Sequence, residues 1–121
     1  MASPVQILPG DGLYRRFLSF CLKADHTLSS AVWKTKKKPE KDASVDLGRL
    51  TTPEDSLGRA PNPGFGLCSL PAKIPLSYDR VVQHTPVEGN WAHCLILGKL
   101  TKSECRDYSD GASILIPPPS Q

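Results

Sequence analysis

Hydrophobic side chains recur every three or four residues near the start of the chain, and most charged side chains between them fall on the other side of a helical projection. Asp11 lies between two glycines ahead of this pattern and is a candidate N-cap. The spacing predicts an amphipathic helix over residues 13–24 that continues towards residue 33. Its apolar face contains Leu13, Phe17, Phe20, Cys21, Ala24 and Leu28.

Three interpretations fit this N-terminal segment, residues 1–33. The apolar face packs in the core of the protein's own fold, or it docks into a groove on a partner protein with Phe17, Phe20 and Leu28 as anchors. The arginines and serines also fit a cleaved mitochondrial presequence, although Asp11 and Asp25 are unusual in one. The first two interpretations both remove the apolar face from water.

Polar and charged positions dominate residues 34–66. Apolar positions are too few there to offset the conformational entropy that ordering the segment would cost. The pattern therefore predicts a flexible charged linker. Within it, Val45, Leu47 and Leu50 are expected to form at most a transient turn of helix or a short docking motif.

Short apolar runs bounded by Pro, Gly, Asn or Asp return in residues 67–121 and just before them, and such runs are typical of strands. Pro71 and Pro75 reduce one candidate to an edge or irregular strand. Thr101 and Glu104 fit a capping box, which predicts a short helix over residues 102–108. The candidate strands are residues 65–70, 74–78, 80–84, 91–97 and 112–116.

Together these elements predict a small α+β protein that is partly disordered in isolation. It would consist of an N-terminal amphipathic helix (1–33), a disordered linker (34–66) and a small proline-rich region of short antiparallel strands (67–121). Composition supports this picture, because 12 prolines and 9 glycines among 121 residues favour short elements and a small core.

The first residues lack the basic start and apolar run of a secretory signal, and no stretch of 18 apolar residues is present to span a membrane. We therefore expect an intracellular protein, in the cytoplasm or the nucleus. Disulfides are rare in those compartments, so the four cysteines are expected to be free thiols.

The formal net charge of +3 is too small to indicate nucleic-acid binding by itself. Much of the excess comes from one short run in the predicted linker. This run is either a nuclear import signal or an ordinary solvated loop. Its lysines are Lys34, Lys36, Lys37 and Lys38.

Thr52 precedes a proline and is a candidate phosphorylation site. A phosphate there would lie beside two acidic residues. It would need Arg49 or Arg59 to neutralise it.

The stretch between residues 80 and 97 is predicted to form a hairpin. If His84 lies opposite Trp91, then His84, Trp91 and His93 project from one face. Zinc needs three or four protein ligands, and Cys94 would point to the other face. The histidines are therefore predicted to flank a packed Trp91, itself a candidate anchor for a partner, with a zinc site as the weaker alternative.

Motifs for catalysis are absent: the chain has no Gly-rich phosphate loop, nucleophile elbow or H-E-x-x-H. His93 and Cys94 do not form a base and nucleophile pair, because neighbours in a strand point in opposite directions. We expect no enzymatic activity and no cofactor. A stacking platform of His84, Trp91 and His93 beside Arg80 is the nucleic-acid alternative.

These observations predict a small non-catalytic interaction or scaffold protein that docks on a larger protein assembly through its amphipathic helix and extended segments. Two alternatives stay open. One is a zinc- or nucleic-acid-binding module around His84, Trp91 and His93. The other is a recently arisen or alternatively spliced product without a selected function. The sequence identifies neither the partner nor the oligomeric state.

Overall fold

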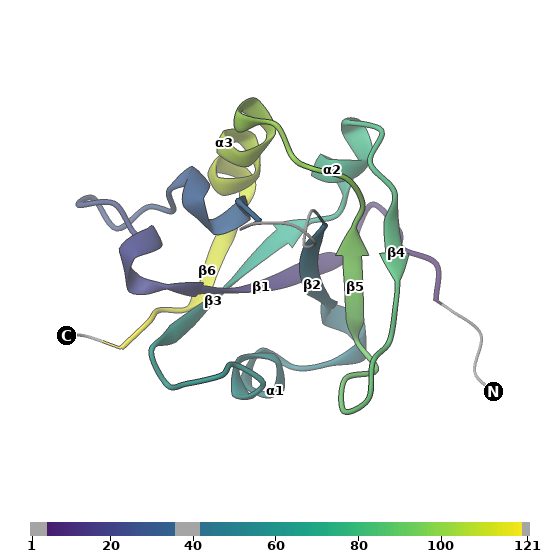
Figure 1. Ribbon diagram of the computed structural model, residues 1–121, viewed down its shortest axis with the longest axis horizontal. Helices are drawn as coiled ribbons and strands as arrows, with labels where there is room; N and C mark the ends of the chain where they lie inside the picture. Colours follow the sequence, from purple (N-terminus) through teal and green to yellow (C-terminus); the bar gives the residue numbers. More distant parts are fainter. Residues whose placement is uncertain (1–4, 36–41, 120–121) are drawn as a thin grey trace.

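Six antiparallel strands form one sheet in the computed structural model, which describes residues 5–35 and 42–119. Their order across the sheet is β4-β5-β2-β1-β3-β6 (Figure 1). The central strand β1 therefore pairs with β2 on one side and β3 on the other. The bounds are β1 Gly12–Leu18, β2 Ala43–Leu47, β3 Phe65–Pro71, β4 Val82–His84, β5 His93–Ile96 and β6 Ser113–Ile116.

Short helices connect the strands. The helices α2 and α3 lie on one side of the sheet, and α1 lies on the other (Figure 1). Within the described residues, no helix is both long enough and apolar enough to cross a membrane. The bounds are η1 Ser19–Cys21, η2 Ser30–Trp33, η3 Gly48–Leu50, α1 Pro53–Gly58, α2 Lys73–Ser77 and α3 Lys102–Gly111, where η denotes a 3₁₀ helix.

The hydrophobic core lies between the sheet and α3. Side chains alternate between the two faces of a strand, so Leu13 and Phe17 of β1 point to the same side as Val45 and Leu47 of β2. All four side chains are at most 2% exposed. Ile96 of β5 extends this layer, because its strand partner Ala43 belongs to the same buried face.

The helix α3 covers the side of the core that faces away from the sheet. Thr101 accepts the backbone N–H of Glu104 at 3.1 Å, and the Glu104 side chain accepts the N–H of Thr101 at 3.2 Å. The predicted capping box is therefore confirmed. Tyr108 of α3 meets Trp33 of η2 edge to face, with ring centroids 5.5 Å apart, and both rings are fully buried.

The predicted N-terminal helix is wrong, because residues 12–18 form the central strand β1. Leu13 and Phe17 are four residues apart, an even spacing that places them on one face of a strand as well as on one face of a helix. Arg15 interrupts the alternation of apolar and polar residues that would have indicated a strand. Its guanidinium occupies a core-side position where the pattern of a strand would require an apolar residue.

The predicted disordered linker, residues 34–66, is also wrong, because residues 42–66, the longer of its two described parts, contain β2, η3, α1 and the start of β3. The strand β2 buries every second side chain against the core. The helix α1 begins at an N-cap, Thr52, whose hydroxyl accepts the N–H of Asp55 at 3.1 Å, and Pro53 occupies its first turn. The chain is a compact α+β domain, not a helix and a β region joined by a flexible segment.

Four of the five candidate strands are confirmed, as β3, β4, β5 and β6. The candidate over residues 74–78 is wrong, since it forms the helix α2. Proline is tolerated at position 75 because the backbone N–H groups in the first turn of a helix have no intrahelical acceptor, so a missing N–H costs nothing there. Proline therefore excluded a central strand correctly, but it did not exclude a helix.

Candidate functional site

A row of polar side chains crosses the face of the sheet opposite the core. In the strand register, Asp46 lies opposite Tyr14 on β1 and opposite His93 on β5. Tyr14 in turn lies opposite Ser69, and Ser69 lies opposite Ser113. We call the surface that contains these five residues the polar face. The helix α1 lies on this side of the sheet, so the row is only partly open to solvent.

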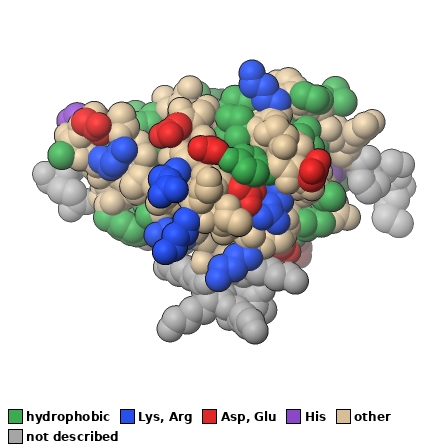
Figure 2. Space-filling model, turned by 90° about the horizontal axis from the view of Figure 1, so that it is seen from above, with side chains coloured by type: hydrophobic (Ala, Val, Ile, Leu, Met, Phe, Trp, Pro, Cys, Tyr) green, Lys and Arg blue, Asp and Glu red, His purple; other side chains and the backbone are tan. Residues whose placement is uncertain are grey.

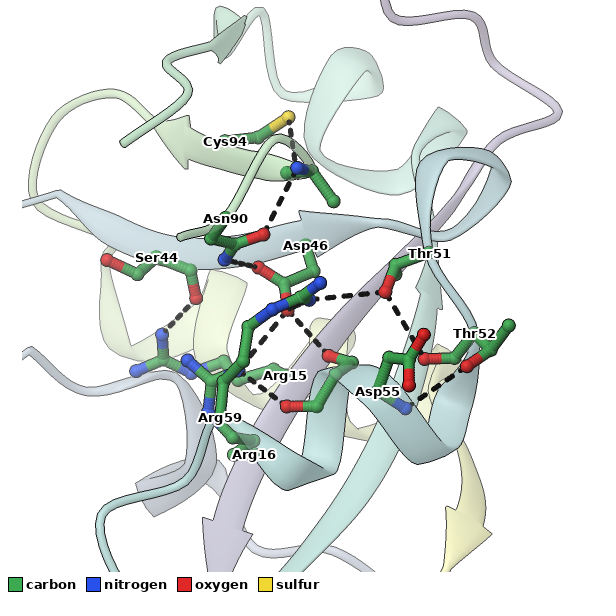
Figure 3. Close-up of polar contacts among 12 residues, drawn as sticks. Arg15, Arg16, Ser44, Asp46, Thr51, Thr52, Asp55, Arg59, Asn90 and Cys94 are labelled. Carbon is green, nitrogen blue, oxygen red and sulfur yellow. Dashed lines mark hydrogen bonds and ion pairs between the residues drawn. The ribbon is translucent and has the colours of Figure 1, made fainter. Parts of the chain in front are cut away.

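Asp46 is the buried centre of the polar face, with 1% of its side chain exposed. Its Oδ2 accepts the hydroxyl of Ser56 at 2.6 Å, and its Oδ1 accepts Nδ2 of Asn90 at 2.8 Å (Figure 3). The Asn90 Oδ1 then accepts the backbone N–H of Ala92 at 3.1 Å. One carboxylate therefore joins α1 and the β4–β5 loop to strand β2.

Two arginines also converge on Oδ2 of Asp46. Arg16 of β1 donates from Nη1 at 3.2 Å, and Arg59, just after α1, donates from Nη1 at 3.1 Å (Figure 3). The same Nη1 atoms donate to the Ser56 carbonyl, in the case of Arg16, and to the Thr51 hydroxyl, in the case of Arg59. The arginine side chains are 26% and 28% exposed. We call Arg16 and Arg59 the arginine pair.

The arginine pair has donors to spare. Within residues 5–35 and 42–119, the hydrogen bonds of both guanidinium groups involve Nη1, and Nε and Nη2 have no protein partner. Two positive charges face the single negative charge of Asp46, so the cluster keeps an excess positive charge. A partly exposed cluster with this charge and these donors is suited to binding an anion.

The carboxylate of Asp46 stays ionised for several reasons. Burial by itself would raise its pKa, but the hydrogen bonds from Ser56 and Asn90 and the charges of Arg16 and Arg59 outweigh burial and lower the pKa below its usual value. Its two oxygens already accept from four side chains, and these contacts occupy the carboxylate. Asp46 is therefore a positioning residue for the arginine pair.

Arg15 has a structural role on the core side of β1. Its Nε donates to the Val32 carbonyl at 2.6 Å, its Nη1 donates to the Ser44 carbonyl at 2.8 Å, and its guanidinium carbon lies 5.4 Å from the ring centroid of Trp33. Burial lowers the pKa of Arg15. The Ser44 carbonyl accepts this side chain and is therefore not free to accept a backbone N–H of β1. We infer that this contact limits the pairing of β1 with β2, whose last pair of opposite residues is Tyr14 and Asp46.

His93 adds an acceptor beside Asp46. Its Nδ1 lies 2.8 Å from the Thr85 carbonyl, and a carbonyl accepts only, so Nδ1 carries the proton. In the neutral ring Nε2 is then an acceptor, and it has no partner among the described residues. The N–H of Leu47 donates to the Ala92 carbonyl, so Asp46 and His93 form a non-hydrogen-bonded pair, in which side chains come closest.

His84 is fully used within the fold. Its Nδ1 accepts the N–H of Val5 at 2.8 Å, which requires Nε2 to carry the proton and to donate to the Trp91 carbonyl at 2.7 Å. The two rings are also in edge-to-face contact, with centroids 4.7 Å apart. His84 therefore attaches the N-terminal segment to the hairpin and has no free nitrogen for a ligand.

The predicted register of this hairpin is wrong. His84 lies opposite Cys94, not opposite Trp91, so His84 and His93 project from opposite faces. The reason is the loop, where Val87 and Asn90 exchange backbone hydrogen bonds and the Asn90 side chain is held by Asp46. The predicted zinc site and the predicted nucleic-acid platform both required His84 and His93 on one face of the hairpin, and the two side chains do not share a face. In the described part of the chain, no three or more His, Cys, Asp or Glu side chains are placed to hold a metal.

The predicted partner anchors divide into two groups. Phe17 and Leu28 are 2% and 4% exposed and belong to the core, as the first interpretation of the N-terminal segment required. Phe20 and Trp91 are 71% and 43% exposed, so both remain available to a partner. Thr52 is exposed and caps α1.

Of the predicted import signal, Lys34 is exposed at the end of η2. The other three lysines, Lys36, Lys37 and Lys38, lie outside the described residues.

Sequence reasoning missed the residues of the arginine pair and their carboxylate. One signal was present for Asp46: Ala43, Val45 and Leu47 alternate with polar residues, which is typical of a half-buried strand. The high local charge outweighed that signal. Nothing local indicated that Arg16 and Arg59, 43 positions apart, meet at one atom.

No protein-family model, curated protein or solved structure matches this chain. Its function is therefore inferred from the geometry and chemistry of the polar face.

Proposed function

We propose that this protein is a non-catalytic interaction module that binds an anionic group of a partner protein, in particular a phosphate, at the arginine pair. One observation carries the proposal: Arg16 and Arg59 converge on Oδ2 of Asp46, and their Nε and Nη2 atoms have no partner among the described residues. The planar guanidinium group matches the oxygens of phosphate with two parallel hydrogen bonds. A phosphate bridging both arginines would more than offset the single excess positive charge of the cluster.

The bonding of the cluster favours binding over catalysis. General-base catalysis needs a carboxylate with an accessible lone pair, and nucleophilic catalysis needs a hydroxyl beside a free base. Asp46 accepts from four side chains, and the Ser56 hydroxyl is buried and donates to it. His93 supplies one acceptor, which suits an N–H or hydroxyl of the partner next to its phosphate.

The β4–β5 loop offers an apolar contact near the polar face. Val87 and Trp91 are 52% and 43% exposed, and Asn90 between them is held by Asp46. An exposed aromatic residue next to a charged site is a common interface anchor. We also propose that the protein is intracellular. Its four unpaired buried cysteines support this location, because disulfides are rare inside the cell.

Isothermal titration calorimetry with a capped Gly-phosphoserine-Gly peptide tests the proposal. We expect binding with a Kd below about 1 mM and about tenfold weaker binding by the Arg59→Gln variant, because a hydrogen bond to a charged group is lost. Arg59→Gln leaves Asp46 paired with Arg16, so the fold is retained. Arg106→Gln, an exposed arginine on α3, is the matched control and should bind like the unmodified protein.

Three outcomes would overturn the proposal. They are no binding of the phosphopeptide, equal binding of the unphosphorylated peptide, and equal losses in the Arg59→Gln and Arg106→Gln variants. The last result would mean that net charge, not the arginine pair, attracts the peptide.

A further inference from the structure

Three hydroxyl side chains in residues 51–56 have different roles in the fold. The Ser56 hydroxyl is buried and donates to Asp46. The Thr52 hydroxyl caps α1 by accepting the N–H of Asp55. Thr51 is partly exposed, and its hydroxyl donates only to the Thr52 carbonyl, at 3.5 Å, which is at the outer limit of a hydrogen bond. The Thr51 hydroxyl can therefore be modified with the least loss to the fold.

The oxygen of this hydroxyl also contacts the arginine pair. It accepts a hydrogen bond from Nη1 of Arg59 at 3.1 Å, and the same Nη1 lies 3.1 Å from Oδ2 of Asp46 (Figure 3). The Nε and Nη2 atoms of Arg59 have no partner among the described residues. A phosphate bonded to the Thr51 oxygen therefore lies within hydrogen-bond reach of a guanidinium group whose other donors are unused.

Such a phosphate reverses the charge of the cluster. Arg16, Arg59 and Asp46 together carry one excess positive charge. A phosphate on threonine adds a charge of about −1.5 to −2 at neutral pH, so the cluster becomes net negative. A second phosphate, on a partner protein, then meets repulsion as well as occupied donors.

The backbone around Thr51 is accessible to a modifying enzyme. Thr51 lies at a bend between η3 and α1 with φ −151° and ψ −175°, which is an extended conformation, and the next residue, Thr52, is exposed. Glu54 and Asp55 follow, and both are exposed. Protein kinases select their substrates partly by the pattern of charges around the target hydroxyl, so a kinase that prefers acidic residues after its target fits this segment.

We propose that Thr51 is a regulatory phosphorylation site whose phosphate occupies the arginine pair and excludes the phosphate of a partner. The inference rests on the proposed function, because it concerns the regulation of the same anion site. A protein kinase transfers the γ-phosphoryl group of ATP to Thr51. The bond between the Thr51 oxygen and phosphorus forms, the bond from phosphorus to the ADP oxygen breaks, and the hydroxyl proton passes to the base of the kinase.

The other side of the sheet offers a matched control. Figure 2 looks onto the side of α2 and α3, where basic and acidic side chains are interspersed. Ser103 is exposed on α3. A phosphate on Ser103 changes the net charge of the protein by the same amount as one on Thr51, but the sheet separates it from the arginine pair.

Isothermal titration calorimetry with the capped Gly-phosphoserine-Gly peptide tests the proposal on three forms of the full chain. They are the unmodified protein, the protein with phosphate on Thr51 and the protein with phosphate on Ser103. We expect the Thr51 phosphate to weaken binding at least about tenfold, because like charges then face each other at the site. The Ser103 phosphate should change binding by less than about twofold, because salt screens charges that are distant from each other.

Two further measurements do not depend on the peptide. The Nε–H signal of Arg59 in a ¹H–¹⁵N spectrum should shift when Thr51 carries phosphate, while that of Arg15, which already donates to the Val32 carbonyl, stays in place. Incubation of the folded protein with MgATP and a kinase that selects acidic residues after its target should place phosphate on Thr51. Mass spectrometry of the digested protein locates that phosphate.

The inference is overturned if the Thr51 phosphate leaves peptide binding unchanged, or if the Ser103 phosphate weakens it equally. It is also overturned if the Arg59 signal does not shift or if the kinase leaves Thr51 unmodified. If the unmodified protein does not bind the peptide, the proposed function fails instead. The Arg59 signal then still decides whether the Thr51 phosphate occupies the arginine pair.

Discussion

Arg16 and Arg59 share one acceptor, Oδ2 of Asp46, although they come from β1 and from the turn after α1. Two guanidinium groups repel each other unless an anion lies between them. Asp46 supplies that anion from inside the protein and is itself attached to α1 and to the β4–β5 loop. The positions of the two arginines are thus determined before any ligand arrives, which reduces the entropy cost of binding one.

Asp46→Asn should destabilise the protein by about 3 kcal/mol, because it leaves two partly buried guanidinium groups without a carboxylate. The midpoint and slope of urea unfolding at neutral pH measure this change. Glu54→Gln, an exposed acidic residue on α1, is the control and should change stability by less than about 0.5 kcal/mol. Equal effects of the two variants would show that Asp46 does not hold the cluster together.

Stability should fall in acid because of Glu104. The hydrogen bond from Arg80 is the largest cause that lowers the pKa of Glu104, to about 2 from an ordinary value of 4.5. A depressed folded-state pKa stabilises the protein above the unfolded-state pKa, and this contribution is lost as the pH falls from about 4.5 towards 2. The loss is at most about 3 kcal/mol.

Urea unfolding at several acidic pH values measures this loss. Glu104→Gln should lower stability at neutral pH and flatten the dependence below pH 4.5, apart from the part that Asp46 contributes. Asp110→Asn, an exposed acid on the same helix, should keep the original dependence. An unchanged acid dependence in Glu104→Gln would contradict the assigned pair.

The four thiols should be unreactive in the folded protein. Burial raises the pKa of Cys68 to about 12 and that of Cys94 to about 11, and it also raises the pKa values of Cys21 and Cys105. Reaction with Ellman's reagent at mildly alkaline pH should therefore proceed only in denaturant. Phe20→Cys, at a position 71% exposed, should add one thiol that reacts at once. Rapid reaction of the native thiols would contradict the compact core.

The two tryptophans should differ in their access to iodide. Trp33 is fully buried and Trp91 is 43% exposed. The fluorescence of the Trp91→Phe variant should therefore resist quenching, while that of Trp33→Phe should be quenched readily. Since Trp33 is a core residue, the second variant needs a dispersed NMR spectrum before it is compared. Equal quenching of two folded variants would contradict the placement of these side chains.

Parts of this fold follow from the sequence and parts do not. The capping box of Thr101 and Glu104 and the strands of the C-terminal half were predictable because their signals are local. The strand β1 was missed because Arg15 interrupts its alternation, and that arginine is satisfied by two carbonyls that are distant in sequence. The strand β2 was missed because local charge suggested solvation.

The candidate site was harder to predict than the fold. The hairpin register depends on the hydrogen bond between Asn90 and Asp46, which are 44 residues apart. A different register reverses the faces of His84 and His93, so the error moved the site to the wrong residues. The contacts of Arg16 and Arg59 with Asp46 depend on the order of the strands in the sheet, and no local sequence pattern specifies that order.

The most direct test of the central proposal is to observe the arginine Nε–H signals by ¹H–¹⁵N NMR while the phosphoserine peptide is added. Arg15 is an internal control, because its Nε already donates to the Val32 carbonyl. We predict that the Nε–H signals of Arg16 and Arg59 shift together and saturate at one peptide concentration, while that of Arg15 stays in place. Saturating shifts confined to other arginines, or no shifts at all, would contradict the assignment of the arginine pair as an anion-binding site.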